Sequence, residues 1–142
     1  MRWQVPVVLV GFVAAAGLWA HHGSAGFDQN KPLHFTGKIN SVEWVNPHVV
    51  VHVEVAAAEG SVATWLVNTR PPNAAKRMGF PESAFAIGAQ VTVDGYQAID
   101  GSNRVNGTSI EFQDGKKITT PDCFNGGPYC YTAAPAKAIR VQ

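Results

Sequence analysis

The chain is short of charged residues and lacks the sequence signature of any common enzyme class. Charged residues make up only 15% of its 142 residues, and 11 Lys plus Arg nearly balance 10 Asp plus Glu. Nucleic-acid binding depends largely on neutralising phosphates, so a chain without a basic run is not expected to have a nucleic-acid partner. The motifs of serine hydrolase elbows, zinc proteases, phosphate loops and Rossmann folds are also missing. The sequence therefore favours a protein that is not an enzyme.

Cysteine is scarce, with two residues, and both lie near the C-terminus. Cys123 and Cys130 flank the sequence Phe-Asn-Gly-Gly-Pro-Tyr, whose glycines and proline allow the chain to turn back. In an oxidising compartment this spacing predicts a disulfide that closes a short loop. A thiol redox pair is the alternative, but such pairs usually have a Cys-x-x-Cys spacing, which is absent here. We therefore predict a structural disulfide.

Long apolar runs are missing except at the N-terminus. Arg2 precedes an apolar run over 5–18, which ends just before Ala20. This pattern predicts a secretory signal peptide over 1–20, and the run is shorter than the roughly 20 residues that a membrane helix needs. Cleavage before Leu18, cleavage after Ala25 and a retained N-terminal anchor are the alternatives. We expect an exported protein with no membrane span once the signal is removed.

Two histidines follow the expected cleavage site directly. A cut there makes His21 the first residue, so its α-amine and imidazole lie beside the imidazole of His22. Such nitrogen ligands suit copper better than zinc, with nickel as a further candidate. His48 or His52 could add a third nitrogen, but four strand residues separate them by about 13 Å, so both cannot bind one ion. The sequence suggests a metal site of His21, His22 and His48, with His34 the weakest candidate; a flexible arm that binds no metal is the alternative.

Most of the remaining chain has the alternation of apolar and polar residues that predicts strands. Gly37 indicates a bend or bulge in the first of them, and Asn46-Pro47 indicates a turn after it. Prolines before helix-forming residues and a glycine after them predict a short helix over 71–79. From 113 onward, Gly, Pro, Lys and Thr predict an irregular tail. The predicted strands are 33–44, 48–55, 61–69, 89–98 and 104–112.

Three strands, a short helix and two strands follow one another, in the order of a small all-β fold. This order is that of the five-stranded Greek-key barrel of the oligonucleotide/oligosaccharide-binding (OB) type, and an open β-sandwich is the alternative. Asp94, Asp100 and Asp114 each precede a glycine, which predicts that all three lie in turns. The expected organisation is a signal peptide over 1–20, an N-terminal arm over 21–32, an OB-like barrel over 33–115 and a disulfide-bearing tail over 116–142.

One group of side chains suggests a binding surface. Trp44, Asn46 and His48 flank the predicted turn, and Trp65 lies on the following strand. Exposed aromatic rings beside an imidazole form a surface suited to a small ligand or a partner protein. In the alternative, both tryptophans fill the ends of the barrel, Asn46-Pro47 is only a turn, and the imidazole hydrogen-bonds across it.

Several short motifs follow one another from His21 to about Gly115. They are His21-His22, Lys31-Pro32, Gly37, Val42-Glu-Trp-Val-Asn-Pro-His48, Trp65, Pro72-Asn-Ala74, Arg77-Met-Gly79, Gly88, Val91-Thr-Val93 and Asp100-Gly-Ser-Asn-Arg104. In this order they resemble a family of small exported bacterial proteins catalogued as a domain of unknown function. The resemblance implies a periplasmic or secreted bacterial protein with a compact β-barrel, and it brings no established activity. The cysteine-bearing tail departs from the family pattern.

Together these features predict an exported, non-catalytic binding or accessory module whose partner is a periplasmic protein or a small ligand. The alternative is a copper-binding carrier or a small redox protein built on the N-terminal histidine.

Overall fold

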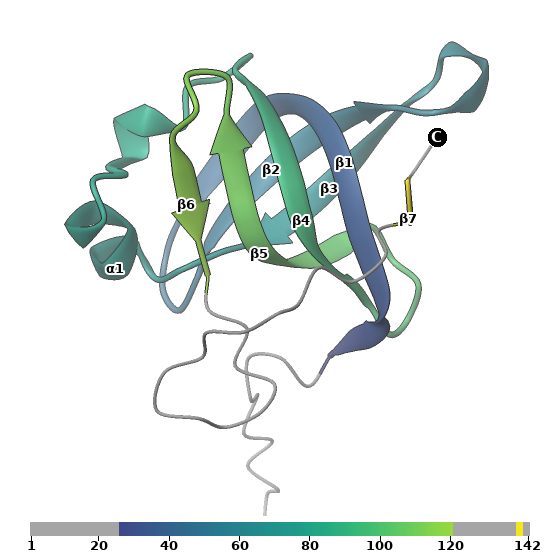
Figure 1. The fold of residues 1–142 in the computed structure, drawn as a ribbon, viewed down its shortest axis with the longest axis horizontal. Coiled ribbons are helices and arrows are strands. Elements are labelled where there is room, and N and C mark those ends of the chain that lie inside the picture. Colours follow the sequence, from purple (N-terminus) through teal and green to yellow (C-terminus); the bar gives the residue numbers. More distant parts are fainter. Residues whose placement is uncertain (1–25, 121–138, 141–142) are drawn as a thin grey trace, which may run out of the picture.

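The computed structural model describes residues 26–120 and 139–140 of the chain. These residues form a mostly β structure with one short α-helix, which confirms the predicted β-rich class (Figure 1). Among them, no helix is long and apolar enough to cross a membrane. The elements are β1 (Phe27–Trp44), β2 (Val49–Ala56), η1 (Ala58–Gly60), β3 (Val62–Asn68), α1 (Pro72–Arg77), η2 (Glu82–Ala84), β4 (Gln90–Ala98), β5 (Arg104–Phe112), β6 (Lys117–Thr119) and β7 (Ile139–Arg140).

Five strands form a near-closed ring because the long strand β1 takes part in two pairings. Its first part, from Phe27 to Lys38, pairs with β4, and its last part, from Lys38 to Trp44, pairs with β2. The ring continues from β2 to β3, from β3 to β5 and from β5 to β4. The pairing of β3 with β5 is parallel and covers only three residue pairs, whereas the other four are antiparallel.

Gly37 lies where β1 passes from one partner strand to the other. A Cβ atom at this position would lie 2.6 Å from Val53 Cγ1 and closer still to the carbonyl oxygen of Glu54. The absence of a side chain therefore allows β1 to approach β2 at the change of partner. The pairing with β4 is regular through Gly37, and a register irregularity with β2 follows between Ile39 and Ser41. The irregularity therefore lies further along β1 than the bend or bulge predicted at Gly37.

The interior of the ring is filled by alternate residues of the strands. On β2, Val49, Val51, Val53 and Val55 are all buried, as their spacing predicts. At the end of the ring nearest α1, aromatic rings pack on one another, with Phe85 5.9 Å from Trp44 and 5.6 Å from Phe112 between ring centroids. The buried residues that form the core are Leu33, Phe35, Ile39, Val49, Val51, Val53, Val55, Trp65, Val67, Ala75, Phe80, Phe85, Val91, Val93, Val105, Ile110 and Ile118.

One strand is longer than predicted, and another lies where no strand is predicted. β1 begins at Phe27 instead of at residue 33, because the Phe27 side chain is buried and its backbone pairs with that of Ala98. β6 lies in the segment predicted to be irregular, where Gly115 adopts a φ of 80° and lets the chain reverse. Ile118 then packs into the core, so burial of this single side chain favours a strand that local composition does not predict.

Candidate functional site

The two tryptophans of the predicted binding surface lie in different environments. Trp65 is 5% exposed inside the ring, and its ring centroid lies 5.4 Å from that of Phe35. Trp44 is half-buried and packs against Phe85. The structure therefore does not bring Trp65 to the outer surface beside Trp44. Trp65 instead packs in the interior, as in the alternative in which the tryptophans fill the ring.

The turn between β1 and β2 carries the other two residues of that surface. Asn46 and Pro47 are exposed and are joined by a cis peptide bond. His48 lies one residue before β2, and its Nδ1 atom is 3.0 Å from the carbonyl oxygen of Thr69. The imidazole thus contacts the residue that follows β3, the strand next to β2, and not a residue across the Asn46-Pro47 turn as the hydrogen-bonding alternative has it.

The predicted copper site lies largely outside the residues that the structure describes. His21 and His22 lie outside the described residues, as do Cys123 and Cys130 of the predicted disulfide. His52 Nε2 lies 2.7 Å from a carboxylate oxygen of Glu43. Within 26–120 and 139–140, no group of three or more His, Cys, Asp or Glu side chains is arranged to hold a metal ion.

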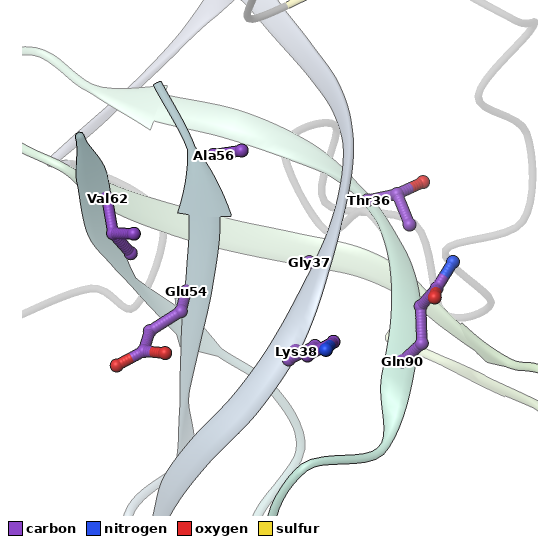
Figure 2. A pocket seen from close by; sticks show the side chains of 7 residues that line it. All are labelled: Thr36, Gly37, Lys38, Glu54, Ala56, Val62 and Gln90. Carbon is purple, nitrogen blue, oxygen red and sulfur yellow. The ribbon is translucent and has the colours of Figure 1, made fainter. Parts of the chain in front are cut away.

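A groove of about 450 Å³ lies on the outer surface where β1 leaves β2, a site that the sequence did not indicate (Figure 2). Gly37 and Ala56, which are small, and Val62 of β3, which is 63% exposed, line it. Polar side chains from three strands complete the lining. The lining residues are Thr36, Gly37, Lys38, Glu54, Ala56, Val62 and Gln90.

The strand pairings explain why residues of both charge signs line the groove. Lys38 is directly opposite Glu54 on β2 and directly opposite Gln90 on β4. The side chain of Asn40 donates a hydrogen bond to the Glu54 carboxylate and so orients it. Alternation along β1 and β2 predicts that these side chains point outward, but the register that places them together is a property of the folded sheet.

A second polar cluster lies on the outer face of β1, β4 and β5, around Asp94. One carboxylate oxygen of Asp94 is 2.6 Å from His34 Nδ1, and the other accepts a 2.7 Å hydrogen bond from the Ser109 hydroxyl. Lys117 Nζ lies 3.9 Å from the same second oxygen. Burial alone would raise the pKa of Asp94, but the hydrogen bonds from His34 and Ser109 and the charges of His34 and Lys117 lower it overall.

The prediction that Asp94 lies in a turn is wrong. Asp94 is in the middle of β4, where its cross-strand neighbours His34 and Ser109 provide hydrogen bonds. Asp100 and Asp114 do lie in turns, and each accepts a hydrogen bond from the backbone amide two residues later. A glycine after an aspartate does not by itself distinguish an aspartate in a turn from one within a strand. Gly95 is needed for close packing between strands, because a Cβ there would lie 2.5 Å from Val105 Cγ1.

Comparison with protein families gives one match, to a family of unknown function, DUF6152, over residues 8–109. The chain belongs to this family. No curated protein and no solved structure matches the chain. The family match includes every residue of the groove and the Asp94–His34 pair, whereas Lys117 lies beyond it. The resemblance inferred from the sequence motifs is thereby confirmed, and the family brings no activity with it.

The lowered pKa of Asp94 gives this family member an expected pH dependence. A carboxyl group whose pKa is lower in the folded state stabilises the fold above its ordinary pKa of about 4, and that stabilisation is lost as the pH falls through the folded value. Asp94→Asn should therefore lower the free energy of unfolding at neutral pH, with the deficit closing in acid. Because the Asp94 side chain is 40% exposed, we expect the effect to stay below about 1 kcal/mol.

Urea denaturation at several pH values between neutral and about pH 2 measures this dependence. Glu82→Gln is the control, since Glu82 is an exposed carboxylate on η2 away from the cluster. A deficit for Asp94→Asn that stays constant across the pH range would contradict the assigned role of Asp94.

Proposed function

We propose that this protein is an exported, non-catalytic binding module that holds a polar ligand or a segment of a partner protein in the groove at Gly37. The observation that carries the proposal is the placement of Lys38 and Glu54 on neighbouring strands at one groove of about 450 Å³. Binding sites for small molecules generally span about 300–1,000 Å³, so the groove is large enough for such a ligand.

The chemistry of the groove favours a ligand with both charge signs or with amide groups. The ammonium group of Lys38 can bind a carboxylate, and the carboxylate of Glu54 can bind an ammonium or amide group. Thr36 and Gln90 add a hydroxyl and an amide, each able to donate and accept hydrogen bonds. This mixture of charges is poorly suited to a nucleic-acid backbone, which requires mainly positive groups.

The surface predicted around Trp44, Asn46 and His48 remains a second place where a partner could bind. Burial of Trp65 removes one of its two aromatic rings. The groove has a larger set of outward polar groups from three strands, and we therefore favour it as the binding site.

We further propose that the near-closed ring is a small barrel of the OB type. The pairing order β1-β2-β3-β5-β4-β1 and the helix between β3 and β4 support this assignment. A periplasmic location is supported by the apolar N-terminal run that follows Arg2.

The proposal is tested by nuclear magnetic resonance titration of the purified protein with zwitterionic amino acids and dipeptides, and in parallel with neutral monosaccharides. We expect dipeptides to shift the backbone amides of 36–38 and 54–56. Lys38→Ala should weaken that binding about tenfold, because it removes one charge-assisted contact.

Lys31→Ala is the matched control, since Lys31 is also an exposed lysine on β1 but does not line the groove. The control should bind the dipeptides as tightly as the wild-type protein. Dipeptide shifts that avoid the groove, or an equal loss of affinity in both lysine variants, would refute the proposed site.

A further inference from the structure

Within the described residues, strand β1 has one edge that is only partly paired. One side of β1 pairs with β4 from Phe27 to Lys38, with an irregularity before Pro32, whereas pairing with β2 on the other side begins only at Lys38. Over the first part of β1, β7 is the only described element on the side away from β4, and it pairs in parallel with Leu33 and His34. Figure 1 shows β7 as a short yellow strand beside β1.

An incompletely paired strand edge is a template for another extended chain, because its backbone N–H and C=O groups can form a further ladder. The pairing of β7 shows that this edge accepts a strand in the parallel orientation. The pairing ends at His34, two residues before Thr36, which lines the groove. A longer strand that continued past His34 would therefore reach the groove.

We propose that this edge of β1 binds an extended peptide segment of a partner protein in parallel, and that β7 occupies the edge within the same chain until such a segment replaces it. The inference rests on the proposed function, since it names the ligand class of the groove. Backbone pairing along β1 supplies affinity that does not depend on peptide sequence, and the groove side chains supply selectivity.

The chemistry along the edge explains why the ligand is a peptide strand. Leu33 and Phe35 are buried toward the interior of the ring. On the outer face, Thr36 pairs with Thr92 through hydroxyl groups 3.1 Å apart, and His34 is held by Asp94. The side chains of 33–35 are thus committed to the fold, so a ligand at this edge gains mainly from the backbone there; Thr36, Lys38 and Glu54 then contact charged or amide groups further along it.

β7 is well suited to be displaced, because its described residues pair with only two residues of β1. β7 competes well with a separate peptide because it is part of the same chain, which raises the effective concentration of β7 at the edge of β1. Weakening β7 should therefore increase the affinity of the edge for an added peptide.

The test compares the wild-type protein with Ile139→Pro, which removes a backbone N–H from β7, and with Ile139→Val, which keeps it. The probe is a fluorescent synthetic peptide with the sequence of residues 136–142, Ala-Lys-Ala-Ile-Arg-Val-Gln. By fluorescence anisotropy, we expect Ile139→Pro to bind the peptide about tenfold more tightly than the wild-type protein and Ile139→Val to match the wild-type protein. The bound peptide should shift the backbone amides of 33–37.

A chain ending at Ala138 is a second variant that removes β7 altogether and should also bind the peptide more tightly. Equal peptide affinities in wild-type, Ile139→Pro and truncated proteins would overturn the proposal. Light scattering that shows dimers of Ile139→Pro and of the truncated protein, with no gain in peptide binding, would overturn it too. The strand that occupies the edge would then belong to a second copy of this chain. If the β7 variants gain no peptide affinity while the protein still binds dipeptides and Lys38→Ala weakens that binding, the strand edge is rejected as a binding site. The proposed groove is then unaffected.

Discussion

Replacing Gly37 with alanine is expected to destabilise the protein by about 3 kcal/mol or to prevent folding. The added Cβ would lie 2.6 Å from Val53 Cγ1 and even closer to the backbone oxygen of Glu54. A backbone atom cannot rotate away as a flexible side chain can, so β1 and β2 would have to separate. Because β1 changes its pairing partner at this position, the strain would open the ring where the groove lies. Thermal and urea denaturation followed by circular dichroism measure the loss.

Gly26→Ala is the matched control for this substitution. Gly26 precedes β1, has no positive φ, and an added Cβ there would meet no atom within 4 Å. We expect its stability to stay within about 0.5 kcal/mol of the wild-type value. Similar stability of the two alanine variants would show that close approach of the strands does not require a glycine at 37.

Replacing Trp65 with alanine is expected to lower the free energy of unfolding by about 3–5 kcal/mol. The indole is 5% exposed, packs against Phe35 with ring centroids 5.4 Å apart, and belongs to the central core. Its removal from β3 leaves a cavity inside the ring. The neighbouring strand β2 cannot move in to fill this cavity, because β2 is held by pairing with β1 on one side and with β3 on the other. Urea denaturation gives the free energy directly.

Trp65→Phe separates the packing of the indole from its polar group. The buried Nε1 atom of Trp65 has no hydrogen-bond acceptor among the described residues, so removing its N–H should offset part of the volume lost. We expect this variant to lie within about 2 kcal/mol of the wild-type protein, well above Trp65→Ala. A phenylalanine variant as unstable as the alanine variant would show that the indole N–H contributes to stability.

Local sequence patterns predict much of the secondary structure. Alternation gives the buried valines of β2, and proline followed by helix-forming residues gives α1 close to its observed bounds. The patterns miss β6, where one buried isoleucine decides the structure, and they place β1 six residues late because its first residues pair irregularly with β4. Both errors occur where tertiary contacts outweigh local composition.

The candidate site is harder to obtain from sequence. Residue type alone suggests Trp44, Asn46 and His48, because such residues are often found in binding sites. It does not suggest Lys38 and Glu54, which resemble ordinary surface charges. Their importance depends on register, since a shift of one residue would move either of them to the other face of the sheet. Asp94 shows the same point, because only cross-strand pairing with His34 and Ser109 distinguishes it from the aspartates of the turns.

The sequence by itself determined the membership in the family, the β-rich class and the short helix, because each depends on motifs or patterns of residues along the chain. Only the tertiary structure decided that β1 pairs with both β2 and β4, that Trp65 is buried, and that Lys38 and Glu54 line one groove. These features depend on which strands pair and in which register. Pairing between distant segments is set by burial and backbone hydrogen bonding across the whole sheet, which no local pattern encodes.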